Sequence, residues 1–210
     1  MNWKRWILFL TTIGVAGAQQ REIGILGGGG LSNGLPVLGA PTSASAGLRS
    51  GPAVGVLVGQ DLYSHWSGEI RYLFEQREFH LASGGTTAGF SGQAHAFHYD
   101  LVYQRRIRDN RVRPYLAAGG GVKIFRGTGQ ETPYRPLMED AYLTRTQQVK
   151  PMLTAGGGIK IQVGNRMMLR VDIRDQVTRF PEKIVAAAPG RKIEGWLQDF
   201  VPSVGLSWRF

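Results

Sequence analysis

The sequence predicts an all-β fold, an eight-stranded antiparallel up-and-down barrel, from three observations. Beyond residue 20, apolar and polar side chains alternate with a period of two in eight segments, while helical periodicity is scarce. The connections between these segments alternate between long and short. Several segments also exceed the typical soluble strand of about 5–6 residues and match the roughly 9–11 residues of a tilted membrane-crossing strand.

The first residues have the pattern of a secretory signal peptide. Lys4 and Arg5 precede a short apolar run that ends in Ala-Gly-Ala. This run is shorter than the roughly 20 residues of a membrane-spanning helix, which disfavours the alternative of an N-terminal anchor. We therefore expect a signal peptide over 1–18 and one barrel domain over 19–210 of an exported chain.

The eight segments differ in clarity but share one pattern. In the seventh, Leu169 and Val171 lie on one face, opposite Arg170 and Asp172 on the other. The first two segments show a weaker version of the same alternation. The predicted strands are 21–31, 51–61, 66–77, 97–106, 112–126, 149–163, 167–178 and 199–210.

The connections predict that the two ends of the barrel differ. Short turns have the Gly, Asn and Asp residues that favour tight reversals, and they lie at 62–65, 108–111 and 164–166. The long connections are rich in Gly, Pro, Ser and Thr, and they lie at 32–50, 82–93, 127–148 and 181–197.

Periodicity alone does not say which face of the barrel points inward. In a soluble barrel the apolar face fills the core, whereas in a membrane barrel it faces lipid. The export signal favours the membrane barrel, and so do aromatic residues near strand ends, as in interfacial girdles. These aromatics are Tyr63, Trp66, Phe79, Phe90, Trp196, Trp208 and Phe210.

Glycines on the polar face also favour the membrane barrel, because they would fill a soluble core poorly. The clearest case is a repeat, PYLAAGGGVKI at 114–124 and PMLTAGGGIKI at 151–161. In each copy a lysine, Lys123 or Lys160, shares its face with two glycines. We expect these glycines to leave lumenal space for long charged side chains. The alternative of a soluble calyx for an apolar ligand stays open.

Two segments resemble a known family. The C-terminal SVGLSWRF, and RPYLAAGGGVKIF at 113–125, resemble strands of small bacterial outer-membrane β-barrels of the OmpA/OmpX type. The resemblance implies a closed eight-stranded transmembrane barrel in the bacterial outer membrane, with short periplasmic turns and long extracellular loops. It also implies that the barrel-assembly machinery reads the last strand, with Trp208 and Phe210 as the assembly signal.

The inward face would carry many charges, which must be paired because isolated buried charges are prohibitively unfavourable. We expect a charge network that plugs the lumen, which favours a closed barrel over an ion or proton path. Its predicted members are Glu69, Arg71, Glu75, Arg77, Asp100, Arg106, Lys123, Lys160, Arg170, Asp172 and Arg174.

The expected function is non-enzymatic, structural or adhesive, and exerted through the long loops. The alternative is a lipid A-modifying enzyme, whose chemistry needs a serine activated by a histidine and a carboxylate. The candidate segment is FSGQAHAFHYD, with Ser91, His95, His98 and Asp100. His95 has lipid-facing parity, whereas His98 and Asp100 have lumenal parity, so the four do not share a face.

Composition limits the partners. The chain has no cysteine and only four histidines, which are dispersed, so we expect neither a metal site nor a cofactor. A net charge of +10 suggests an anionic environment. We expect contacts with outer-membrane lipid, with lipopolysaccharide phosphates and with an extracellular ligand through the four long loops. No nucleic-acid-binding module is recognisable.

Overall fold

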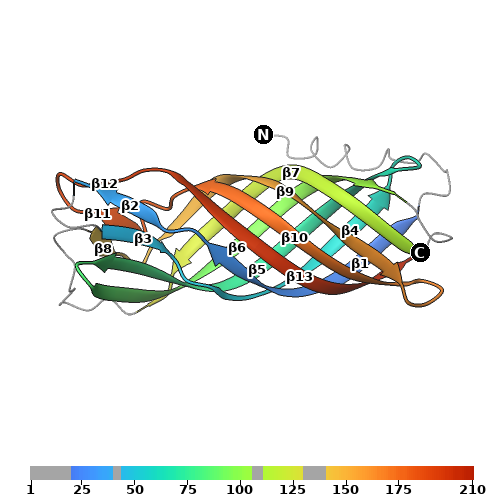
Figure 1. Ribbon diagram of the computed structural model, residues 1–210, viewed down its shortest axis with the longest axis horizontal. Helices are drawn as coiled ribbons and strands as arrows, with labels where there is room; N and C mark the ends of the chain where they lie inside the picture. The colour runs from blue at the N-terminus through green and yellow to red at the C-terminus, as the bar shows by residue number, and fades with distance from the viewer. Residues whose placement is uncertain (1–19, 40–43, 106–110, 130–140) are drawn as a thin grey trace, which may run out of the picture.

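The structure, a computed structural model, describes residues 20–39, 44–105, 111–129 and 141–210. Eight long antiparallel strands form a closed ring in which each pairs with its neighbours and the last pairs with the first. Figure 1 shows them tilted across one barrel wall. They are β1 (Arg21–Ser32), β4 (Gly51–Asp61), β5 (Trp66–Ser83), β6 (Thr86–Gln104), β7 (Val112–Gly127), β9 (Gln147–Gln162), β10 (Met167–Arg179) and β13 (Trp196–Arg209). The predicted eight-stranded barrel is confirmed.

Side-chain exposure confirms which face points outward. The apolar residues of each strand lie on the outside of the ring, and Leu116 and Leu153 are 68% and 63% exposed there. No helix among the described residues is long and apolar enough to cross a membrane. The predicted signal peptide and Arg106 lie outside the described residues.

Five short strands gather at the end of the barrel with the long connections (Figure 1). They are β2 (Leu35–Leu38), β3 (Ala44–Leu48), β8 (Ala141–Leu143), β11 (Val185–Ala187) and β12 (Lys192–Ile193). β3 pairs with the end of β5 nearest Ser83, and β2 and β12 continue the sheet from β3. β8 pairs with β11. We call these five strands, with the adjoining ends of β5 and β6, the cap.

The long loop predicted at 82–93 is wrong. β5 continues to Ser83, and β6 begins at Thr86. Only Gly84 and Gly85 connect them, with φ of 55° and 83°. A two-residue hairpin turn of this kind requires positive φ at both positions, which glycine adopts without strain. The remaining residues of the predicted loop are strand.

The inner face of the cap has the opposite polarity to the inner face of the barrel below it. Phe79 and Phe90, predicted to lie in an interfacial girdle, instead point inward, and they are 0% and 6% exposed. They pack in an apolar core together with Leu81 and Phe125. At this end the strands therefore have the polarity of a soluble barrel, with apolar side chains inside and polar side chains outside.

The two copies of the glycine-rich repeat pair directly with each other. β7 and β9 are antiparallel neighbours, so that Tyr115 lies opposite Gly158 and Met152 lies opposite Gly121. Large residues of one copy thus face glycines of the other, which lets the cross-strand side chains interlock. The two copies of the repeat therefore have complementary side-chain sizes when they pair as antiparallel strands.

Candidate functional site

Charged side chains fill the interior of the barrel in three clusters. The structure buries ten of the eleven predicted network residues there, each at most 5% exposed, and the eleventh, Arg106, is outside the described residues. Each cluster contains as many formal positive as negative charges among the members named below. Such pairing satisfies the requirement that buried ions be neutralised.

The first cluster lies toward the short-turn end. Arg170 donates to Glu22 at 2.8 Å and to Glu69 at 2.7 Å. Lys160 donates to the second Glu22 oxygen at 2.9 Å. Arg71 and Asp172 complete the cluster. Arg71 pairs with Glu69 and donates to Asp172 at 2.7 Å. Three cations and three carboxylates therefore interlock across strands from opposite sides of the ring.

Tyr115, the tyrosine of the first repeat copy, holds this cluster together. Its hydroxyl donates to Asp172. Its ring lies about 5.5 Å from the charged groups of Lys160, Arg170 and Arg174, which is within the range of cation–π attraction. Gly158, opposite Tyr115 on the facing strand, leaves room for the Tyr115 partner Asp172, because a Cβ at Gly158 would lie 2.8 Å from the Cα of Asp172.

The central cluster is smaller. Arg174 donates to Asp100 at 3.1 Å, and His98 Nδ1 lies 3.0 Å from the other Asp100 oxygen. Thr154 also donates to Asp100. A Cβ at Gly119 would lie 2.6 Å from this carboxylate, so the glycine makes room for it.

The third cluster lies toward the cap. Lys123 donates to Glu75 at 2.8 Å, to Gln176 at 2.7 Å and to Asp199 at 2.5 Å. Arg77 donates to the same two carboxylates at 3.1 and 3.0 Å. Two cations and two carboxylates thus form a closed square in which each ion touches both partners of opposite sign.

Two carboxylates of these clusters, Glu22 and Asp199, are absent from the predicted network. Both lie on the inward parity of their strands, so the alternation contained the signal. Glu22 belongs to the weakly alternating first strand, and Asp199 is the first residue of the predicted last strand. Without them the predicted set is more basic than acidic. With them, the six cations of the set that the structure describes balance six carboxylates.

The cap covers the third cluster with an apolar core. Phe125 lies two residues beyond Lys123 on the inner face of β7, and its ring packs edge-on against Phe79 at 6.4 Å between centroids. Leu48, Phe180 and Leu197 are also fully buried in this core. On the cap's outer side, desolvation and the charge of Arg49 lower the pKa of His80. The cap edge therefore gains no positive charge from this histidine at neutral pH.

The residues of the possible catalytic group lie on opposite sides of the barrel wall. Ser91 and His95 are on the outer face, four residues apart on β6, or about 13 Å at the usual rise per residue. His95 instead hydrogen-bonds to Tyr72 at 2.8 Å. His98 and Asp100 are inside. Among the described residues, no group of three or more His, Cys, Asp or Glu residues could hold a metal.

A closed ring with apolar outer and charged inner faces is the architecture of a membrane barrel. The model of the outer membrane protein beta-barrel domain family matches residues 7–210. The chain belongs to this family. The end with the short turns at 62–65 and 164–166 is therefore periplasmic, and the cap lies at the extracellular end of a barrel in the bacterial outer membrane.

Solved outer-membrane barrels share this fold at low sequence identity. The outer membrane protein OprG of Pseudomonas aeruginosa has 12% identity and a TM-score of 0.60, covering 91% of this chain and 95% of that one. Neisserial surface protein A has 11% identity and a TM-score of 0.57, covering 92% of this chain and 100% of that one. The N-terminal β-barrel domain of Pseudomonas aeruginosa OprF has 14% identity and a TM-score of 0.50, covering 91% of this chain and 97% of that one. No curated protein matches the sequence.

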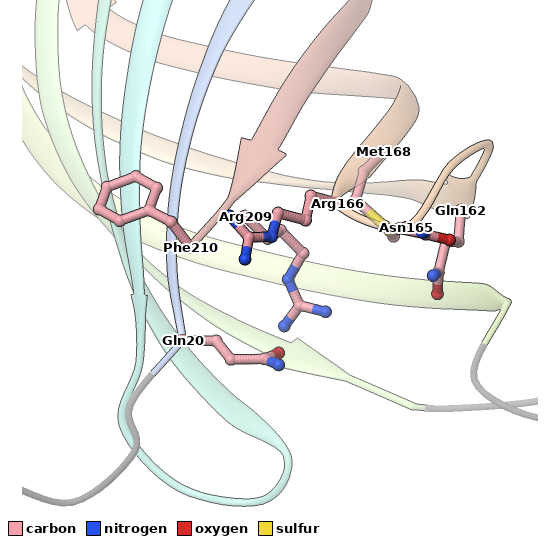
Figure 2. Close-up of a pocket in the computed structure, with 7 residues that line it drawn as sticks. All are labelled: Gln20, Gln162, Asn165, Arg166, Met168, Arg209 and Phe210. Atoms are coloured by element: carbon pink, nitrogen blue, oxygen red, sulfur yellow. The ribbon is translucent and has the colours of Figure 1, made fainter.

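The periplasmic end of the barrel is hollow. A cavity of about 530 Å³ opens there, and Figure 2 shows its lining side chains. Met168 lies inside it and is 1% exposed. The predicted assembly residues lie nearby on the outer face, with Trp208 and Phe210 46% and 60% exposed. The cavity is lined by Gln20, Gln162, Asn165, Arg166, Met168 and Arg209, with Phe210 at its rim.

The third cluster predicts that substitutions of two neighbouring lysines differ strongly in their effect on stability. We expect Lys123→Met to reduce the free energy of unfolding by about 3–5 kcal/mol, because it leaves Glu75 and Asp199 unneutralised in a buried site. The matched control is Lys150→Met, at the cross-strand partner position, where the side chain pairs with the exposed Glu182 at 4.0 Å.

Urea unfolding of both variants in lipid vesicles provides the measurement. The control should change stability by no more than about 1 kcal/mol, because Lys150 neutralises no buried carboxylate and its one partner, Glu182, is exposed. Equal effects of the two substitutions would show that Lys123 does not neutralise buried carboxylates in the third cluster.

Proposed function

We propose that this outer-membrane barrel is a closed, non-enzymatic protein that acts through the surface of its extracellular cap, in a structural or adhesive role. The observation that carries the proposal is the filled interior. Three neutral charge clusters and an apolar core follow one another along the barrel. An eight-stranded barrel is only wide enough for its side chains to fill it, so this packing favours a plug over a pore.

The folded cap supports a role at the cell surface. Its short strands are held over a common apolar core, with Leu35, Ala46 and Ile193 all buried. Connections anchored in this way present side chains in fixed positions, and scaffold-held loops commonly carry binding functions. Ligand recognition through 32–50, 127–148 and 181–197 is the expected form of this activity.

Neither alternative function is favoured by the geometry. Enzymatic work on lipid A would need Ser91, His95 and a carboxylate on one face, and the only nearby carboxylate of the group, Asp100, points into the lumen. A soluble calyx would need an apolar interior pocket, whereas charged groups occupy the middle of this barrel.

We also propose how the chain reaches its membrane. Residues 1–18 would direct export, and Trp208 and Phe210 would act as the assembly signal. In support, both aromatics lie exposed on the outer face of the last strand. That strand closes the ring through β1, and the Phe210 amide donates to the Arg21 carbonyl at 3.0 Å.

A closed lumen predicts no steady ion conductance. We expect the purified protein, inserted in planar lipid bilayers, to give no stable channel openings at either polarity. Heat-modifiable migration on a denaturing gel would establish in the same sample that the barrel is folded. Large, long-lived openings from the folded protein would contradict the plug.

Cations on the cap predict binding to lipopolysaccharide phosphates. The double substitution Arg191→Gln and Lys192→Gln should weaken the binding of purified lipopolysaccharide, by roughly 1 kcal/mol per charge, and the remaining binding should depend on salt. Both residues belong to the cap, and Lys192 makes an exposed 3.8 Å pair with Glu194.

The matched control removes two exposed arginines at the periplasmic end, through Arg105→Gln and Arg111→Gln. Lipopolysaccharide titration in a zwitterionic detergent should separate the two double variants. Equal weakening by both would mean that net charge, and not the cap, governs the interaction.

A further inference from the structure

The cavity at the periplasmic end differs from the three clusters, because one of its two arginines has no ion-pair partner among the described residues. Arg209 is partly neutralised, since it donates to Asp61 at 3.1 Å. Arg166, in the turn between β9 and β10, has an exposed side chain with no hydrogen bond or ion pair to any part of the chain that the structure describes. Both arginines line the same cavity.

Neutral amides complete the lining. In Figure 2 the side chains of Arg166 and Arg209 lie between those of Gln20 and Gln162, with Asn165 beside the latter. Two guanidinium groups and three amides supply hydrogen-bond donors from several sides of one space. Buried Met168 bounds the cavity on the inside, and the Glu22 carboxylate beyond it is already bound by Lys160 and Arg170.

Donors arranged in this way suit an anion with several oxygens. Arginine forks bind phosphate oxygens in pairs, with charge-assisted bonds about twice as strong as neutral ones. A phosphate group presents more acceptor oxygens than a carboxylate and would use donors from more than one wall. The cavity is also large enough, at about 530 Å³, for a phosphate and the group attached to it.

We propose that this cavity is a phosphate-binding site open to the periplasm, with Arg166 as its principal ligand and Arg209 as the second. The phosphate has two possible sources. It can belong to a soluble phosphate ester of the periplasm. It can also belong to an anionic lipid headgroup, because Arg209 directly follows Trp208, whose exposed indole faces the surrounding lipid. The site is independent of the cap and of lumen closure, so it goes beyond the proposed function.

The test observes the Arg166 side chain directly. In the wild-type barrel, held in nanodiscs of phosphatidylcholine, the Arg166 Nε–H resonance should shift saturably when inorganic phosphate is added. In nanodiscs that also contain phosphatidylglycerol, the same resonance should already be shifted if the lipid headgroup is the source. A shift in the first arm alone assigns a soluble source, and a shift that needs phosphatidylglycerol assigns the lipid.

Variants then test the assignment. Arg166→Gln should weaken phosphate binding at least about tenfold, which corresponds to one lost charge-assisted hydrogen bond, and Arg209→Gln should also weaken it. The matched control is Arg179→Gln, an exposed arginine on the outer face at the other end of the barrel. Absence of a shift in both nanodiscs, or equal weakening by the control, would overturn the proposal. Because the wild-type signal is read first, a variant that fails to fold does not decide the outcome.

Discussion

The structure depends on one constraint, that backbone polar groups inside a bilayer must pair within the protein. The pairing of β1 with β13 meets it, because it removes the last two free edges of the sheet. Closure by eight strands then creates an interior of a width that side chains can fill. Since the outer face is apolar, the alternating residues give this interior its charges, and those charges have to balance.

Balance explains the details of the lumen. Each of the three clusters is neutral, and each draws its ions from several strands of the ring. The charges therefore also tie the wall together across the interior, as Arg170 does between Glu22 and Glu69. Glycines such as Gly119 and Gly158 are part of the same solution, because a Cβ there would collide with Asp100 or Asp172 and with the backbone of the neighbouring strand.

The solvent outside sets which side of each strand is apolar. In the middle of the barrel the outside is lipid, and the inner face is charged. In the cap the outside is water, so the same alternation continues with Phe79 and Phe90 turned inward. At the periplasmic end the described residues leave a cavity lined by two arginines and three amides.

This dependence on solvent marks what the sequence alone can predict. Where one solvent lies outside, period-two alternation is enough to find the strands and to assign faces, as for the segment from Leu169 to Arg174. It fails at 82–93, where the polarity reverses partway along a strand and the glycine-rich composition imitates a loop. Leu73 shows a related limit. It interrupts the charged face because it packs with Leu26 and Val201 in a small apolar layer of the lumen.

The alternation within one strand cannot predict which charged side chains form ion pairs across the lumen. Parity shows that Asp199 points inward, but only the ring brings it against Lys123 and Arg77. The role of Tyr115 depends in the same way on three cations from β9 and β10. The basic periplasmic cavity is likewise assembled from residues at 20, 162–168 and 209, which are distant in sequence.

The central claim is that the lumen is closed in the middle and open only toward the periplasm. The absence of native cysteine allows a direct measurement with two single-cysteine variants and a membrane-impermeant maleimide. Thr154→Cys places the thiol in the central cluster, and Gln162→Cys places it in the periplasmic cavity. We predict that the folded Gln162→Cys barrel reacts readily, whereas Thr154→Cys reacts only after unfolding. Equally fast labelling of both folded variants would contradict the account.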